Sequence, residues 1–336
     1  MNPKRLVRIG LRTVVGLVVS VAAVLLVVRS ISVSQTAEAI GSAQWSGIGL
    51  VMAAIACDIA VRAWRWRALL RPIRPLSVPT VAVHLLIGYL ANNALPARLG
   101  ELARSHTLGR SQAVSRAAIV GTVAIERILD VVALVLLSAV AVVLVPSGEV
   151  LTAVVGTAVV LSALLLLVLA LAVRGVMPTP AWIAARIRAS AMGESLRRLR
   201  QGLRIVVDRR ALLEGAAATI VAWAFTAIAF AAAAGSLGMQ LSVAEVLLFA
   251  AGVNLATIVP AGPAYLGTFE LAAASVAAAV GVSPVSALAM AIIVHVVIAT
   301  MTTLGGLVAL GSVYLVPRRL PRTALAAEPM HPDDGG

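Results

Sequence analysis

Two interruptions of long apolar stretches constrain this chain more than any other feature. The first is NNALPARLGE, from Asn92 to Glu101, and the second is NLATIVPAGPAYLGTFE, from Asn254 to Glu270. Each places asparagine, proline, glycine and then glutamate where a lipid-facing helix would hold apolar residues only. Proline frees backbone groups that lipid cannot hydrogen-bond, so such a break is tolerated only when it is buried in protein or lines a polar cavity. Related breaks in the two halves of a chain are typical of transporters.

The composition places the chain among membrane proteins. Its residues are 61% hydrophobic, only 12% are charged, and the mean hydropathy is +1.02. Apolar runs of this length exceed those of a soluble core, so we expect an all-α polytopic membrane protein. A net charge of +13 would otherwise indicate nucleic acid. The basic residues lie in clusters between the apolar runs, however, which is typical of topology signals, and we expect no nucleic-acid partner.

Of the 27 Lys and Arg residues, 25 lie in alternate connections; the exceptions are Arg29, near the end of the first apolar run, and Arg127, inside a predicted span. The basic clusters are Lys4, Arg5, Arg8 and Arg12; Arg62, Arg65, Arg67, Arg71 and Arg74; Arg98, Arg104, Arg110 and Arg116; the arginines between 174 and 210; and Arg318, Arg319 and Arg322. The connections 32–45, 146–149, 238–242 and 283–286 contain no Lys or Arg. By the positive-inside rule we therefore expect a cell (plasma) membrane protein with both termini in the cytoplasm.

This pattern predicts about six spanning helices, at residues 13–31, 46–63, 117–145, 150–173, 212–237 and 287–312. Two segments remain, 78–116 and 243–282, and each leaves and returns on one side of the membrane. Each contains a helix, a proline break and a second helix, so we interpret them as re-entrant helical hairpins inserted from opposite faces. The spans before them run in opposite directions, which predicts an inverted repeat. The alternative is that each hairpin is two ordinary spans, giving eight or more full spans.

A single integral membrane domain is expected over residues 1–320. Its pseudo-repeats cover about 46–145 and 212–312, and a basic cytoplasmic segment, 174–211, joins them. Apolar residues at helical spacing in that segment favour an amphipathic helix on anionic lipid headgroups, and the alternative is a solvated basic loop. Residues 321–336 are expected to form a disordered tail. The first span is interpreted as an uncleaved anchor rather than a signal peptide, because further spans follow it.

Three charged residues lie deep within a predicted span. IERILD contains Glu126, Arg127 and Asp130. At about 1.5 Å per residue, Glu126 lies about 15 Å into a hydrocarbon core about 30 Å thick. Glu126 and Asp130 share a helix face, and Arg127 is placed to neutralise Asp130. Such charges commonly face a bundle interior or an aqueous cavity, and the alternative is a structural salt bridge that joins two helices.

Charged residues also follow the first break. Glu101 lies three residues from both Arg98 and Arg104. If a helix restarts just before Arg98, its N-terminal amides point toward the break and Arg98 adds a full charge, an arrangement suited to a phosphate. The alternative is that both arginines are ordinary cytoplasmic flanking cations. Asn92 and Asn93, before the break, either line a cavity or cap free backbone groups.

Glu270 is the isolated charge of the second break. No Lys or Arg lies between Arg210 and Arg318, so Glu270 must find a distant partner such as Arg127, bind a proton or contact water. This isolation favours a functional role. His295, inside the last predicted span, is a candidate proton site because imidazole titrates near neutral pH. A lone intramembrane histidine serves about as often in a hydrogen bond between helices.

The order of these motifs resembles a known family. NNALPARLGELARSHTLGR, a span with ERILD, VPAGPAYLGTFELA and a late intramembrane histidine are similar to the lysylphosphatidylglycerol synthase transmembrane region, a flippase-like membrane domain that also occurs as stand-alone proteins. The resemblance covers about residues 8–318. In fused members a separate soluble domain performs the aminoacyl transfer, so the resemblance implies lipid transport without synthesis. One departure is PAGPAYLGTFE, where the family leads us to expect a more glycine-rich run.

From the residues and the resemblance together we expect transbilayer translocation of a phosphate-bearing lipid, either a phospholipid or a polyprenyl-linked one. The expected substrate-binding residues are Arg98, Arg104, Arg127, Asn92, Asn93, Pro96, Pro260, Pro263 and Gly267. The residues expected to balance charge or couple protons are Glu101, Glu126, Asp130, Glu270 and His295. We expect no cofactor and no metal site, because the sequence contains no aspartate-rich motif and no Cys/His cluster.

Two other function classes stay open: an intramembrane lipid-modifying enzyme, and a non-transporting partner subunit of a lipid or glycan synthase. We expect no enzymatic activity, because the sequence lacks the motifs of lipid phosphatases. A homo-oligomer or a synthase partner is compatible with the sequence. The identity of the lipid, the direction of transport and the energy coupling are not encoded in any motif.

Overall fold

Every regular element that the structure describes is a helix, as the composition predicts. The structure, a computed structural model, describes residues 3–95, 99–144, 208–257 and 261–314, with isolated positions between 156 and 164. Its elements are α1 (Pro3–Ser30), α2 (Val33–Gly41), α3 (Trp45–Leu70), α4 (Val78–Ala94), α5 (Gly100–Gln112), α6 (Arg116–Leu144), α10 (Arg209–Ser236), α11 (Val243–Ala256), the 3₁₀ turn η1 (Pro263–Tyr265), α12 (Thr268–Val280) and α13 (Pro284–Tyr314).

Most of the predicted spans are helices of sufficient length. Within the described residues, α3, α6, α10, α13 and the segment Pro263–Val280 are long and apolar enough to cross a membrane, and the bent pair α1 and α2 adds one more if it counts as a single span. The chain is therefore a multi-pass membrane protein. Apart from the isolated positions between 156 and 164, the predicted span 150–173 lies outside the described residues, as do the predicted tail 321–336 and most of the basic segment 174–211.

The end of α3 differs from the prediction. The predicted span 46–63 stops at the arginines, whereas α3 continues to Leu70. Arg65 and Trp66 are 1% and 0% exposed, so this arginine lies inside the bundle and is not a flanking cation. It is accommodated there because carboxylates on a neighbouring helix pair with it, which a hydropathy pattern does not register.

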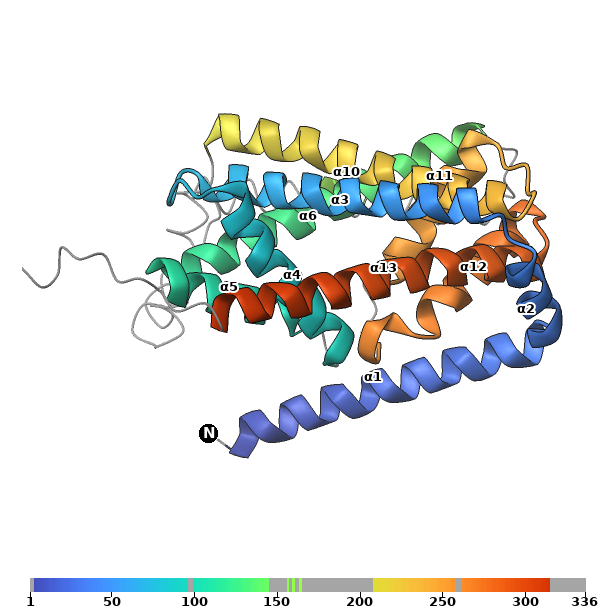
Figure 1. The fold of residues 1–336 in the computed structure, drawn as a ribbon, viewed down its shortest axis with the longest axis horizontal. Helices are drawn as coiled ribbons and strands as arrows, with labels where there is room; N and C mark the ends of the chain where they lie inside the picture. Colours follow the sequence, from blue (N-terminus) through green and yellow to red (C-terminus); the bar gives the residue numbers. More distant parts are fainter. Residues whose placement is uncertain are drawn as a thin grey trace, which may run out of the picture.

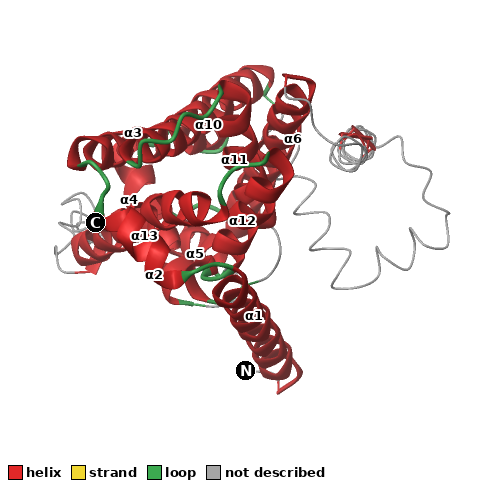
Figure 2. Ribbon diagram, turned by 90° about the vertical axis from the view of Figure 1, so that its right-hand side faces the viewer, coloured by secondary structure: helices red, strands yellow, loops and turns green. Residues whose placement is uncertain are grey.

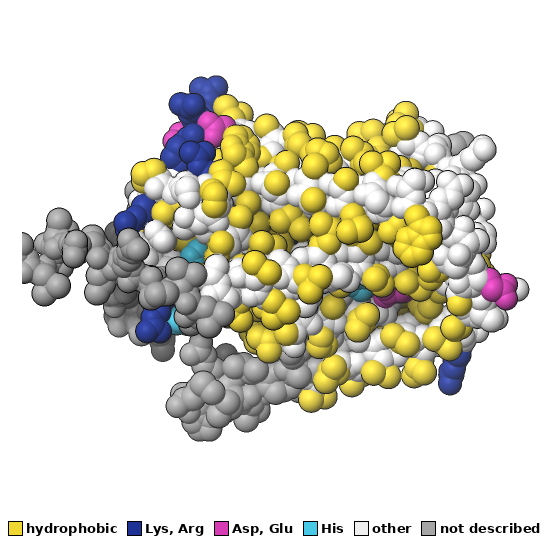
Figure 3. Space-filling model, viewed as in Figure 1, with side chains coloured by type: hydrophobic (Ala, Val, Ile, Leu, Met, Phe, Trp, Pro, Cys, Tyr) yellow, Lys and Arg dark blue, Asp and Glu magenta, His cyan; other side chains and the backbone are white. Residues whose placement is uncertain are grey.

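The N-terminal end of α1 and the C-terminal end of α13 lie at the same end of the helix bundle (Figure 1). On the face drawn in Figure 3, most Lys and Arg side chains gather at that end, and hydrophobic side chains cover much of the middle. This is the distribution that the positive-inside rule predicts when both termini lie on the cytoplasmic side.

Each sequence interruption forms a helical hairpin. α4 and α5 run antiparallel, with the His84 ring 2.9 Å from the Ser111 hydroxyl, and the start of α11 packs near the end of α12. At about 1.5 Å per residue the four helices are about 20 to 26 Å long, shorter than a core of about 30 Å. The hairpins enter the bundle from opposite ends (Figure 1). These lengths favour re-entrant hairpins over paired spans, and the depth of the tips in a bilayer stays a prediction.

The two halves exchange one helix of each hairpin. The helices before the hairpins, α3 and α10, pack antiparallel along their length, because Gly47 faces Ser236 and Gly215 faces Leu69. α4 then packs on α13 of the second half, and α11 packs on α6 of the first half. Figure 2 shows these helices end-on, with α1 projecting away from them. The inverted repeat itself, with pseudo-repeats at about 46–145 and 212–312, stays a prediction.

Specific residues restart the helices of the second hairpin. Ser242 and Glu245 form a capping box at α11. At α12 only the glutamate half of such a box is present, because the N-cap is Gly267: Glu270 accepts from the Gly267 N–H at 2.7 Å. Gly267 has a φ of +85°, and a Cβ there would lie 2.7 Å from the Ser20 carbonyl oxygen of α1. Both facts require glycine at this position.

The hairpins lead to a labelling prediction. In a Cys57→Ser background, Ala94→Cys and Leu266→Cys place thiols at exposed positions near the two tips. We expect neither thiol to react with a membrane-impermeant reagent added on the side opposite to its hairpin's entry. Epitope tags after Arg110 and after Gly281 serve as controls and should report the cytoplasmic and the outer side. Full reaction from the far side would convert the hairpins into paired spans.

Candidate functional site

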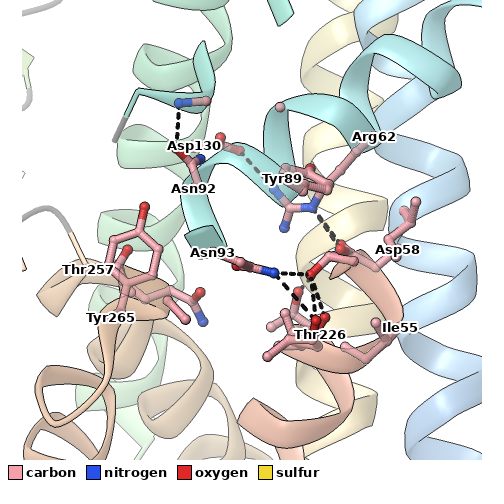
Figure 4. Close-up of a pocket in the computed structure, with 18 of the residues that line it drawn as sticks. Ile55, Asp58, Arg62, Tyr89, Asn92, Asn93, Asp130, Thr226, Thr257 and Tyr265 are labelled. Atoms are coloured by element: carbon pink, nitrogen blue, oxygen red, sulfur yellow. Dashed lines mark hydrogen bonds and ion pairs between the residues drawn. The ribbon is translucent and has the colours of Figure 1, made fainter. Parts of the chain in front are cut away.

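The tips of the two hairpins meet at a cavity of about 350 Å³. Its wall takes side chains from α3, α4, α5, α6, α10, α11, η1, α12 and α13. Figure 4 shows Asp58 and Arg62 on one side, Thr257 and Tyr265 on the other, and Asn93 between them. The cavity therefore lies where the two halves and both broken helices meet, which is where transporters built from inverted repeats bind their substrates.

Four arginines and three carboxylates form what we call the charge network at one side of this cavity. Its members are Asp58, Arg62, Arg65, Arg104, Glu126, Arg127 and Asp130. Glu126 is fully buried and accepts from Arg104 Nη2 at 2.6 Å and from Arg65 Nη2 at 3.2 Å. Asp130 accepts from Arg65 Nη1 at 2.6 Å, and Arg127 Nη2 lies 3.4 Å from it. The network carries one positive charge more than its own carboxylates balance.

Several donors of this region have no acceptor. Arg104 Nη1, Arg127 Nε and Trp223 Nε1 are buried without a hydrogen-bond partner in the described part of the chain. The guanidinium of Arg104 lies over the Trp66 ring, 4.5 Å from its centroid, which positions the group without using its donors. A buried donor without an acceptor costs free energy, and an anion provides the strongest acceptor for a guanidinium.

Glu270 and His295 form a second polar cluster, which we call the acid–histidine pair. His295 Nδ1 lies 2.6 Å from Glu270 Oε1, and His295 Nε2 lies 2.7 Å from the Ala264 carbonyl oxygen. The histidine therefore joins α13 to η1 and to α12. Arg127, suggested from the sequence as a partner of Glu270, is not that partner, because the carboxylate is held by a histidine that packs on the same hairpin.

The asparagines of the first break have separate roles. Asn92 Oδ1 accepts from the Gly100 N–H at 2.8 Å and so caps α5. Asn93 Nδ2 donates to the hydroxyls of Thr302 at 2.9 Å and Thr303 at 3.0 Å, which ties α4 to α13. Both asparagines also line the cavity. Asn92 therefore does both things considered from the sequence: it lines a cavity and it caps a free backbone N–H.

The structure brings most of the predicted site residues to one place. The cavity wall includes Asn92, Asn93, Glu101, Arg104, Arg127, Asp130 and His295. Arg104 is 3% exposed, so it is not a flanking cation. Glu126 and Asp130 join α6 to α5 and α3, which is the structural role weighed for them, and Asp130 faces the cavity as well.

Three predicted site residues lie outside the described residues: Pro96, Arg98 and Pro260. Pro263 begins η1 and Gly267 precedes α12. No three metal-ligating side chains come together within the part of the chain that the structure describes.

Arg65 is the main residue that the sequence analysis missed, and Arg62 is a second. Arg65 contacts two acids of α6, and Arg62 lines the cavity and binds Asp58 at 2.7 Å. A signal was present, because residues 58, 62 and 65 have the i, i+4, i+7 spacing of a single helix face. A polar stripe of this spacing, continuing past the apparent end of a span, indicates a helix that carries charge into the bundle.

The comparisons with known proteins agree with the motifs. A family model described as lysylphosphatidylglycerol synthase TM region matches residues 13–306. The match covers both hairpins and every member of the charge network. No curated protein matched the sequence.

Proposed function

This chain belongs to the lysylphosphatidylglycerol synthase TM region family, and from that premise we propose that it moves a phosphate-bearing lipid across the membrane. The family indicates a role connected with membrane lipids. One observation carries the finer proposal: an intramembrane cavity, formed by two broken helices, is lined by arginines with buried donors that lack acceptors. A lipid phosphate supplies acceptors of the required charge and geometry.

The arrangement favours a headgroup that enters from the side of the bundle. The side chain of Arg127 is 42% exposed, whereas that of its partner Asp130 is 6% exposed. An arriving phosphate would meet Arg127 first and then Arg104 deeper in the cavity. The α5 N-terminus, whose partial positive charge faces the first break, adds to the attraction. The hydrocarbon chains would stay in the bilayer, so only the headgroup needs a polar path.

The remaining parts of the proposal follow from topology. We place the protein in the cell membrane with its basic end, where α1 begins, at the cytoplasmic side and in contact with anionic headgroups. We propose a transporter rather than an enzyme. An intramembrane enzyme would release a chemically altered lipid, and a partner subunit would move no lipid alone.

A leaflet-resolved assay tests the proposal. The purified protein is reconstituted into phosphatidylcholine vesicles that contain traces of fluorescent NBD-phosphatidylglycerol or of an NBD-labelled polyprenyl phosphate, and external dithionite bleaches the outer leaflet. Movement of either probe faster than in protein-free vesicles supports transport. If neither probe moves faster, the proposal is wrong, and mass spectrometry of the recovered lipids then shows whether the protein altered them.

Arg104 provides a sharper prediction. Arg104→Lys keeps the positive charge and a contact to Glu126, but it removes the planar fork of donors. We expect translocation to fall roughly tenfold or more, because a hydrogen bond to a charged group is lost. Arg110→Lys, at an exposed position of the same helix, is the matched control and should transport normally. Equal rates for the two variants would remove Arg104 from the substrate site.

A further inference from the structure

We infer that the acid–histidine pair, Glu270 with His295, is a proton-binding site that closes the tip of the second hairpin, so that transport is coupled to protons. This inference rests on the proposed function and names its coupling ion. The hydrogen atoms needed by the observed contacts carry the argument.

His295 makes two hydrogen bonds to atoms that both act as acceptors. The Ala264 carbonyl oxygen can only accept, so the Nε2 atom, 2.7 Å away, must carry hydrogen. Oxygen Oε1 of an ionised Glu270 also only accepts, and it lies 2.6 Å from Nδ1. A second hydrogen must therefore lie between Nδ1 and Oε1, on either atom. The pair holds two hydrogens for two bonds.

Loss of one proton removes one of these bonds. A neutral imidazole facing an ionised Glu270 carries one hydrogen, on Nε2 or on Nδ1. If the hydrogen is on Nε2, the lone pair of Nδ1 faces the carboxylate. If it is on Nδ1, the lone pair of Nε2 faces the Ala264 carbonyl. In either case His295 no longer holds α12 and η1 together, so one proton decides whether the tip is closed.

The backbone at this tip is strained, which makes the closure reversible. Ala264 and Tyr265 have φ values of +53° and +60°, and such angles are unfavourable for residues with a Cβ unless the surroundings impose them. His295 supplies one of the imposing contacts. Ala264 and Tyr265 both line the cavity, so a tip that relaxes after proton loss changes the wall of the substrate site directly.

Most charged groups around the acid–histidine pair are already ion-paired. Within the cavity wall, Asp58, Arg62, Arg127 and Asp130 pair with one another, and Arg104 pairs with Glu126 behind the wall. The wall's other titratable groups are Tyr89 of α4, Glu101 of α5 and Tyr265 of η1. His84 of α4 faces α5 instead.

The described charged side chains of the helices behind the pair lie away from it. Arg29 of α1 and Glu38 of α2 are exposed, and Glu245 of α11 is held by Ser242. The side chain of α1 nearest the break is Ser20, whose hydroxyl accepts from the Gly262 N–H at 2.8 Å. His295 and Glu270 both hydrogen-bond to backbone atoms of the break, at Ala264 and Gly267.

A labelling experiment tests the proton site without any lipid transport. Ala299→Cys, in a Cys57→Ser background, places a thiol on the cavity wall one helical turn from His295. The rate of its reaction with a small maleimide is measured in vesicles between about pH 5 and about pH 8. This rate is divided by the rate measured at Ser34→Cys, an exposed position in α2. The resulting labelling ratio corrects for the intrinsic pH dependence of thiol chemistry. We expect the ratio to rise about tenfold with pH.

Two variants fix the tip in opposite states. In Glu270→Gln the amide donates to Nδ1 or accepts from it, so the bond persists at every pH and the ratio should stay low. His295→Phe keeps the stacking on Phe269, whose ring centroid lies 4.5 Å away, but it makes no hydrogen bond, so the ratio should stay high. Gel filtration is used to check that each variant is folded. If only one of them folds, that variant alone is enough for the test. A ratio that is flat in the unaltered pair, or a Glu270→Gln ratio that still follows pH, overturns the inference.

The outcome is separable from that of the proposed function. A pH-dependent ratio in a protein that moves neither NBD-labelled lipid leaves the proton site standing and removes translocation. Lipid movement together with a labelling ratio that does not change with pH supports translocation and removes the proton site.

Discussion

Replacing Glu126 by glutamine is expected to destabilise the protein severely, by about 3 to 5 kcal/mol. The substitution preserves shape, so packing is unchanged and the effect comes from charge. Glu126 is fully buried between Arg65 and Arg104, and its neutral replacement leaves two buried guanidinium groups without that counter-charge. Thermal unfolding in detergent, followed by gel filtration, measures the loss as a fall in the temperature at which half of the protein remains monodisperse.

Two further variants separate charge from general sensitivity. Glu214 also bridges two arginines, Arg71 and Arg210, each at 2.9 Å, but this cluster is partly exposed and lies near the basic end of the bundle. Glu214→Gln should therefore change stability little, because water screens the remaining charges. In Glu126→Gln combined with Arg65→Met the excess positive charge returns to its original value, and most of the stability should return. A double variant as unstable as Glu126→Gln alone would show that charge balance is not the cause.

The second large effect is expected at the two glutamates that follow the breaks. Glu270→Gln should fold, because the glutamine carbonyl oxygen can still accept from the Gly267 N–H. Translocation of NBD-phosphatidylglycerol should nevertheless fall roughly tenfold or more, since the tip can no longer release its hydrogen bond. Glu101 also lies in the first turn of the helix that follows its break, α5, and lines the same cavity. Glu101→Gln should therefore show a similar loss.

A matched control exists for these variants. Glu245 is also a capping-box glutamate, and its carboxylate accepts from the Ser242 N–H at 2.7 Å, but it lies outside the cavity wall. Glu245→Gln should transport at the normal rate. If Glu270→Gln and Glu101→Gln also do so at equal protein levels, the paired breaks are structural hairpins and the transport site lies elsewhere.

The sequence reveals the breaks and the charges but not how they pair. Asparagine, proline and glutamate at membrane depth leave few structural options, so the hairpins and the deep position of Glu126 could be predicted from length and hydropathy. The buried position of Arg65 could not be predicted in this way. Hydropathy falls at the arginine cluster, so the predicted span stops there, although α3 continues to Leu70. The partners of Arg65, Glu126 and Asp130, lie 61 and 65 residues away, and only packing brings them together.

The same limit applies to Glu270. Its isolation from any Lys or Arg in the sequence showed that it needed an unusual partner, and His295 was separately a candidate proton site. Joining the two requires knowing that α13 passes the tip of the second hairpin. The cavity depends on packing to an even greater degree, because its wall takes residues from nine elements, and no local pattern records that the halves exchange one helix of each hairpin.

This exchange has a consequence for biosynthesis. Asn93 of the first hairpin donates to Thr302 of α13, a residue synthesised 209 positions later. When the ribosome has completed the first half, α4 has no α13 to pack on and Asn93 lacks its threonine partners. The first hairpin must therefore wait in the membrane, or in the insertion machinery, until α13 emerges. The charge network within the first half, by contrast, needs only α3, α5 and α6 for its ion pairs, so it can form early and hold the unfinished half together.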